Sequence, residues 1–261
     1  MAVTNFIQSI WSKKIQDDLE LKCKLVDNCL RDYEGDCKYA QSVKILGVGE
    51  PTIGDYDNTK DITIEEMSDR GQLLTIDQAK YFAFYVDDVD KAQSVPGLAE
   101  RYQEKAVHGL AVARDTYVAN LIAAATNKTT IAAMDEEGFK KAIDDAIVAL
   151  RERNFDEEGV IEITPAGYNL LKNYLISAST NNPELIKKGV VGVYDQFDVI
   201  MSNNLKTPGC VRGKKAIAFA GQINEVEALR AEKRFKDIVR GLDTFGAKVI
   251  DEARIQVLVT A

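Results

Sequence analysis

Residues 96–126 read PGLAERYQEKAVHGLAVARDTYVANLIAAAT, and they form the longest helical pattern in the chain. Pro96 suits the first turn of a helix, where its missing N–H costs no hydrogen bond. Apolar residues then recur at steps of three and four, the period of one helix face; they are Leu98, Tyr102, Ala106, Leu110, Ala113, Tyr117, Leu121 and Ala124. At about 1.5 Å per residue, such a helix is comparable in length to the diameter of a small domain. The stretch predicts one long helix that organises the fold.

Helices and strands alternate after this stretch. Asp135 is placed to cap a helix that ends near Arg153, with an apolar face of Phe139, Ala142, Ile143, Ala146, Ile147 and Leu150. Thr164-Pro165 opens a further helix that runs to about Ile176. We expect strands at 159–163, 190–194, 197–201, 216–220, 235–241, 247–250 and 254–259, and a charged helical stretch at 222–232. The pattern predicts a compact α+β unit.

The residues before the long helix predict a helical segment and an exposed arm. Residues 5–33 carry apolar residues mostly at helical spacing, and they include Phe6, Ile10 and Trp11. Strands expected at 43–49, 72–77 and 80–87 bracket residues 50–70, which hold seven acidic residues and few large apolar ones. An isolated hairpin is marginal in water, so we expect this two-stranded arm to pack on another molecule. A mobile surface loop of a monomer is the alternative.

Composition argues against most active-site chemistry. With 46% hydrophobic residues and 28% charged residues the chain is an ordinary globular one, and its net charge of −8 does not favour sequence-specific DNA binding. The single histidine, His108, and the cysteines Cys23, Cys29, Cys37 and Cys210 form no metal-binding or nucleophilic cluster. We interpret His108 as a structural helix residue and the cysteines as structural thiols of a reducing compartment. No catalytic residue, metal or cofactor is expected, and neither a signal peptide nor a membrane span.

The order of these elements resembles the major (coat) capsid proteins of tailed bacteriophages, which have the Hong Kong 97-type fold. Short stretches add to the resemblance, at 6–12, 31–35, 53–56, 74–77 and 82–90, and at 239–249 with its LDTFGAK. The resemblance implies an α+β fold with an N-arm at 1–42 and an extended E-loop hairpin at 43–93. It also implies a P-domain at 94–128 and 222–250, with a spine helix at about 96–126, and an A-domain at 129–221 and 251–261.

What the resemblance implies about function is a structural protein and not an enzyme. Such a protein self-assembles through pentamers and hexamers into the icosahedral head of the virion. Assembly is expected in the cytoplasm of the bacterial host, and no membrane is expected as a partner. Expected partners are other copies of the chain, a separate scaffolding protein, portal and head-completion proteins, and packaged double-stranded DNA without sequence-specific contacts. The implied inter-subunit residues are Phe6, Ile10 and Trp11 of the N-arm and Pro51, Thr52, Ile53, Gly54, Asp55, Tyr56, Asp57 and Asp61 of the E-loop.

Two other functions stay open from the sequence. An encapsulin-like compartment has the same fold and encloses a cargo enzyme. A soluble α+β enzyme would need a deep polar pocket near Asp87, Asp88 and Asp90, although these residues lack the spacing of a calcium loop and fit a solvated strand end better. The acidic arm predicts basic patches on a neighbouring subunit and hence salt-sensitive assembly.

Overall fold

A computed structural model describes residues 23–34, 42–45, 71–87, 98–178, 192–230 and 236–260 of the chain. The long helix is confirmed as α3, Leu98–Ala124. Its buried face is rotated from the predicted one, because the helix packs on a sheet and on an N-terminal segment at once. Of the predicted face Leu110 is fully buried, whereas Tyr102 is half exposed. Among the helix residues whose burial the structure describes, the buried apolar ones are Val107, Leu110, Ala111, Val118, Ala119 and Ile122.

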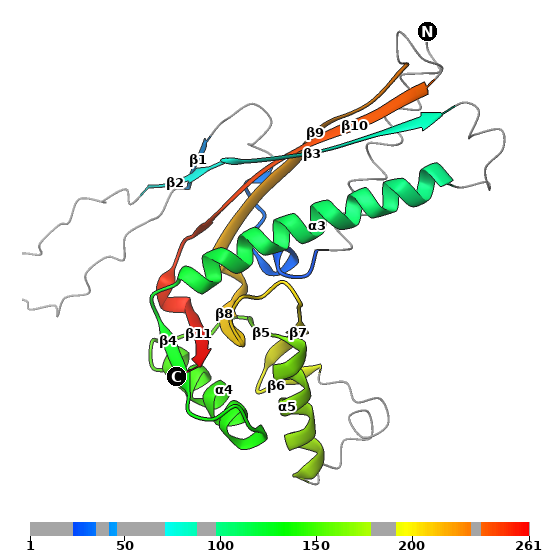
Figure 1. Ribbon diagram of the computed structural model, residues 1–261. Helices are drawn as coiled ribbons and strands as arrows, with labels where there is room; N and C mark the ends of the chain where they lie inside the picture. Colours follow the sequence, from blue (N-terminus) through cyan, green and yellow to red (C-terminus); the bar gives the residue numbers. More distant parts are fainter. Residues whose placement is uncertain are drawn as a thin grey trace, which may run out of the picture.

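An antiparallel three-stranded sheet lies along α3 (Figure 1). Its order is β3 (Gln78–Asp87), β10 (Lys236–Val249), β9 (Ile217–Arg230). The helix predicted at 222–232 is wrong, because this stretch pairs with β10 as far as Arg230. β10 is also one continuous strand where two were predicted. Backbone pairing on both edges of β10 outweighs the helical preference of the Ala, Leu, Glu and Arg residues in β9.

The base of the predicted arm is a short antiparallel pair, β1 (Ser42–Ile45) with β2 (Gln72–Thr75). This pairing confirms that strands on the two sides of residues 50–70 meet. Val43, Ile45 and Leu74 pack on Ala218 and Ala220 of β9. β2 and β3 are separated by a corner at residues 76–77, after which β3 pairs with β10 and not with β1.

A second sheet has six strands in the order β4-β11-β8-β5-β7-β6 (Figure 1). The strands are β4 (Lys128–Ile131), β5 (Gly159–Ile163), β6 (Val193–Tyr194), β7 (Phe197–Met201), β8 (Gly209–Gly213) and β11 (Ile255–Thr260). Both predicted helices are confirmed as α4 (Glu136–Arg151) and α5 (Pro165–Ser177). Their caps also form, since the side chains of Asp135 and Thr164 accept hydrogen bonds from the backbone N–H groups of Gly138 and Gly167. The predicted apolar face of α4 is fully buried against this sheet.

The opposite face of the six-stranded sheet packs with α3 and with residues 23–30. The helix predicted over 5–33 is wrong in its described part, where the only helical turn is η1 (Val26–Asn28). The remaining residues of that prediction, 5–22, lie outside the described part of the chain. Backbone groups that an α-helix would use internally are here bonded to charged side chains of α3 and of the six-stranded sheet. Among the described residues no helix is long and apolar enough to cross a membrane.

Candidate functional site: a buried polar junction

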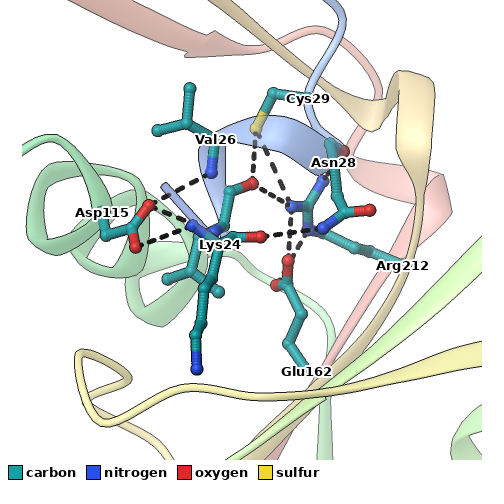
Figure 2. Close-up of polar contacts among 8 residues, drawn as sticks. Lys24, Val26, Asn28, Cys29, Asp115, Glu162 and Arg212 are labelled. Carbon is teal, nitrogen blue, oxygen red and sulfur yellow. Dashed lines mark hydrogen bonds and ion pairs between the residues drawn. The ribbon is translucent and has the colours of Figure 1, made fainter. Parts of the chain in front are cut away.

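Residues 23–30 lie between α3 and the six-stranded sheet beside three buried charged side chains, two of which, Asp115 and Arg212, bind their backbone. These side chains are Asp115 of α3, Glu162 of β5 and Arg212 of β8. Figure 2 shows Asp115 on one side of the segment and Arg212 with Glu162 on the other. We call this set, residues 23–30 with Asp115, Glu162 and Arg212, the junction.

Asp115 binds the start of the segment. Its carboxylate accepts hydrogen bonds from the backbone N–H groups of Lys24 at 3.0 Å, Leu25 at 3.1 Å and Val26 at 3.3 Å. The residue is only 2% exposed. Burial raises the pKa of the Asp115 carboxyl, while the three backbone bonds act in the opposite direction. A carboxylate that accepts hydrogen bonds from successive backbone N–H groups fixes a short turn in place. Because these bonds are to the backbone, they do not depend on which side chains the turn carries.

Arg212 binds the other side of the segment and pairs with Glu162. Its Nη2 donates to Glu162 Oε1 at 2.6 Å and its Nε donates to Oε2 at 3.0 Å. The same guanidinium donates to the carbonyl oxygens of Asn28 at 2.7 Å and Leu25 at 3.1 Å. Both charged side chains are 0% exposed. Burial raises the pKa of Glu162, and the charge of Arg212 opposes that rise. Each group satisfies the other, so neither charge is buried without a partner.

A second buried ion pair lies one residue away on α3 and faces the three-stranded sheet. Arg114 Nε donates to Asp243 Oδ2 of β10 at 2.9 Å, and Nη2 donates to the other carboxylate oxygen. The guanidinium carbon lies 5.6 Å from the ring centroid of Phe219 and 5.9 Å from that of Phe245. Two consecutive residues of α3 therefore bind different parts of the fold.

Two cysteines of the junction, Cys23 and Cys29, and the neighbouring Cys210 of β8 are free, buried thiols. Cys23, Cys29 and Cys210 are 3%, 8% and 0% exposed. The interpretation of these three as structural thiols agrees with their burial, and Cys37 lies outside the described residues. Burial raises the pKa of the Cys29 thiol from 9.0 to about 11 and that of Cys23 to about 12.

We expect the thiols of Cys23 and Cys29 to react slowly with iodoacetamide at pH 8. Only the thiolate reacts, and a pKa two units higher lowers its fraction about a hundredfold. The stability linked to these raised pKa values is complete below the ordinary value of 9.0 and is lost as the pH rises through about 11 for Cys29 and about 12 for Cys23. Peptide mass spectrometry measures the alkylation, with urea-unfolded protein as the fast-reacting control. Alkylation of both cysteines at the control rate would show that the segment is not packed.

A polar hollow of about 240 Å³ opens beside the junction. His108, interpreted from the sequence as a structural residue, has an exposed side chain that lines this hollow. The other lining residues include Lys24, Asp115, Ser202, Asn203 and Asn204. The carboxylate of Asp115 accepts from the backbone of residues 24–26 and from Asn204 Nδ2 at 3.5 Å, so the hollow borders the junction.

The structure does not place the residues that the resemblance named as inter-subunit contacts. Phe6, Ile10 and Trp11 of the N-arm and Pro51, Thr52, Ile53, Gly54, Asp55, Tyr56, Asp57 and Asp61 of the E-loop lie outside the described residues, as do Asp88 and Asp90. Sequence reasoning in turn missed the junction. One signal could have indicated it. Glu162 and Arg212 each lie inside a short strand of otherwise buried residues, where a charged side chain is rare unless it is paired.

Comparison with solved structures shows which known proteins share this fold. No protein-family model matches the chain, and no curated protein matches it either. A solved structure from Mycobacterium phage Che8 matches with a TM-score of 0.77 and 26% identity, over 90% of each chain. The capsid structure of cyanophage P-SCSP1u matches with a TM-score of 0.72 and 16% identity, over 89% of this chain and 86% of the other. The chain has the fold of a tailed-phage major capsid protein.

This capsid fold confirms the resemblance drawn from the sequence. A virus-like particle from Pyrococcus furiosus also matches, with a TM-score of 0.62 and 14% identity over 97% of this chain and 99% of the other. Within this fold, the junction is the place where residues 23–30 meet the long helix and both sheets.

Proposed function

We propose that this protein is the major capsid protein that assembles through pentamers and hexamers into an icosahedral head enclosing double-stranded DNA. The observation that carries the proposal is the match to the structure from Mycobacterium phage Che8, which spans 90% of both chains. A likeness of this extent concerns the whole subunit and not one shared motif. The net charge of −8 is compatible with enclosed DNA whose charge is balanced mainly by counterions.

The subdomains are proposed as they were expected from the sequence. Residues 1–42 are assigned to the N-arm, 43–93 to the E-loop, 94–128 and 222–250 to the P-domain, and 129–221 with 251–261 to the A-domain. The long helix α3 takes the part of the spine helix, and the six-stranded sheet takes that of the A-domain core. A scaffolding protein, portal and head-completion proteins are the proposed further partners, with assembly in the bacterial cytoplasm and no enzymatic role.

The outer face of the three-stranded sheet, the face away from α3, supports contact between subunits. Tyr81 and Tyr85 of β3 are 80% and 69% exposed there, and Leu242 and Leu229 are each 41% exposed. Register places Tyr81 opposite Leu242, and it places Tyr85 opposite Ile238, whose partner on the other side is Leu229 of β9. Exposed tyrosine and leucine in one contiguous patch is typical of an interface. We assign this outer face, with the named N-arm and E-loop residues, to subunit contacts.

An encapsulin-like compartment is the second candidate. It is favoured by the match to the virus-like particle from Pyrococcus furiosus, which covers nearly all of both chains. The phage structures match with higher TM-scores, so the genome-enclosing head stays the first proposal. The contents of purified particles separate the two, because a head contains DNA whereas a compartment contains a cargo protein.

Negative-stain electron microscopy tests the proposed assembly. The protein, with and without its scaffold gene co-expressed, is expected to form closed shells, tubes or capsomer rings. Tyr81→Ser with Tyr85→Ser, and separately a deletion of Thr52 to Asp61, should leave the subunit folded by circular dichroism and reduce assembly at least tenfold. Tyr81→Phe with Tyr85→Phe keeps the aromatic area and is the matched control. Uniform monomers of the unaltered protein under both conditions would contradict the function, and normal shells from a variant would contradict that surface.

A further inference from the structure

The chain crosses between the two sheets in one small region. Residues 125–127 lead from α3 into β4, η3 (Lys214–Ala216) leads from β8 into β9, and residues 250–254 lead from β10 into β11. The crossings are bonded to one another. Thr126 Oγ1 donates to Glu252 Oε2 at 2.7 Å, and the Ile250 N–H donates to Ala216 O at 2.9 Å. All three therefore lie near the C-terminal end of α3.

When all connections between α3 with its sheet and the six-stranded sheet lie in one region, the two can rotate about that region. A further contact at a distance from the crossings would prevent this rotation. Asp115 lies nine residues before Ala124, the last residue of α3. At 1.5 Å per residue this is about 14 Å along the helix from the crossings. A bond to the six-stranded sheet at this distance would resist rotation more strongly than one at the crossings.

Residues 23–30 make such a bond, which begins at Asp115 on the helix and ends at Arg212, two residues before the η3 crossing. Asp115 binds their N–H groups from the helix, and Arg212 binds their carbonyl oxygens from the six-stranded sheet (Figure 2). At the far end, Leu30 N–H donates to Ile217 O at 2.8 Å and Leu30 O accepts from Phe219 N–H at 2.9 Å, both in β9. We propose that residues 23–30 act as a tie that holds the six-stranded sheet at a fixed angle to α3.

Buried surface supports the tie as much as its hydrogen bonds do. Leu25 and Val26 are 0% and 1% exposed, in one core cluster with residues of α3 and of β8 and β11. If the segment left, Asp115 would lose three N–H donors and Arg212 would lose two carbonyl acceptors. Arg212 would keep Glu162, and Asp115 would keep only the side-chain amide of Asn204 at 3.5 Å. A buried charge that loses most of its hydrogen bonds is strongly unfavourable, so we expect the segment to detach only when the helix and the sheet separate enough to admit water.

The tie also has a mechanical consequence. A displacement of the chain just before Cys23 acts on the helix, the six-stranded sheet and β9 together, because the segment is bonded to all three. The inference concerns the single subunit and does not depend on shell assembly, so the two proposals can fail separately.

Two measurements on the unassembled full-length subunit test the tie. Hydrogen exchange follows the backbone amides of residues 24–26. Double electron–electron resonance measures the distance between two spin labels, which are attached to ketone-bearing amino acids that replace Lys105 of α3 and Lys141 of α4. Such labels do not use thiols, so the cysteines of the segment do not interfere. The variants are Asp115→Ala and the milder Asp115→Asn, which is used if the first does not fold. Asp243→Asn is the matched control, since it alters another buried carboxylate bonded to α3 that does not touch the segment.

With the tie weakened, the amides are expected to exchange at least tenfold faster and the distance distribution to broaden or shift. Asp243→Asn should change neither. Faster exchange with an unchanged narrow distribution would overturn the proposal, because the segment would then be bound to the junction without fixing its angle. Unchanged exchange in every folded Asp115 variant would also overturn it, because Asp115 would not be the attachment.

Discussion

Replacing Arg212 with methionine is expected to lower the free energy of unfolding by about 3–5 kcal/mol, the usual cost of leaving half of a buried ion pair. The variant leaves the carboxylate of Glu162 fully buried without its partner. It also removes the guanidinium hydrogen bonds to the carbonyl oxygens of Leu25 and Asn28. Methionine fills much of the same volume, so the loss reports the missing charge and hydrogen bonds more than a cavity.

Urea unfolding of the unassembled subunit measures this change. Arg254→Met is the control, because Arg254 also pairs with two carboxylates, Glu157 at 2.6 Å and Asp251 at 2.8 Å, but its side chain is 37% exposed. An exposed pair contributes at most about 1 kcal/mol. The double variant Arg212→Met with Glu162→Met should recover part of the loss, since no buried charge remains. A loss below about 1 kcal/mol in Arg212→Met would show that water reaches the pair.

Local signals were sufficient to predict the helices. α4 begins after its cap Asp135, and α5 begins at Pro165 after its cap Thr164, as predicted. The apolar period of α4 also predicts its buried face correctly. Capping and periodicity depend on residues within a few positions of one another, so they can be recognised in one sequence.

Pairing between distant strands could not be predicted in the same way. The stretch 222–232 contains good helix formers, yet it extends along β10 because that edge offers a backbone partner at almost every residue. Strand preference depends on such neighbours, and a sequence does not show them. The same limit explains why β10 was predicted as two strands.

The junction was hidden for a related reason. Asp115 and Arg114 look like ordinary charges on a helix surface, and their burial follows only from what packs on both sides of α3. The residues named from the family resemblance lie outside the described part of the chain, so the described site and the predicted one do not overlap. What the sequence did contain was the order of elements, and the comparisons confirm the fold which that order implied.

Replacing Gly246 with alanine is expected to destabilise the subunit by about 1–3 kcal/mol and to displace the base of the arm. A Cβ at Gly246 would lie 2.1 Å from the carbonyl oxygen of Thr75 and 2.9 Å from Cα of Ile76. Both atoms belong to the backbone at the corner between β2 and β3, so neither can move as a side chain would. On its other side the corner is held by Tyr117, whose hydroxyl donates to Asp77 Oδ1 at 2.9 Å. The added methyl group must therefore push the corner off β10 against that bond.

Gly109→Ala is the matched control for this prediction, and its sign should be opposite. Nothing lies within 4 Å of a Cβ built at Gly109, which is exposed on α3. Alanine there is expected to stabilise the helix by about 0.5–1 kcal/mol, because it loses less backbone entropy on folding than glycine does. Urea unfolding measures both variants, and hydrogen exchange of the β1–β2 amides reports the displaced arm. Equal stability of the two variants would show that β10 yields to the methyl group, and the direction of the arm would then not be fixed by this contact.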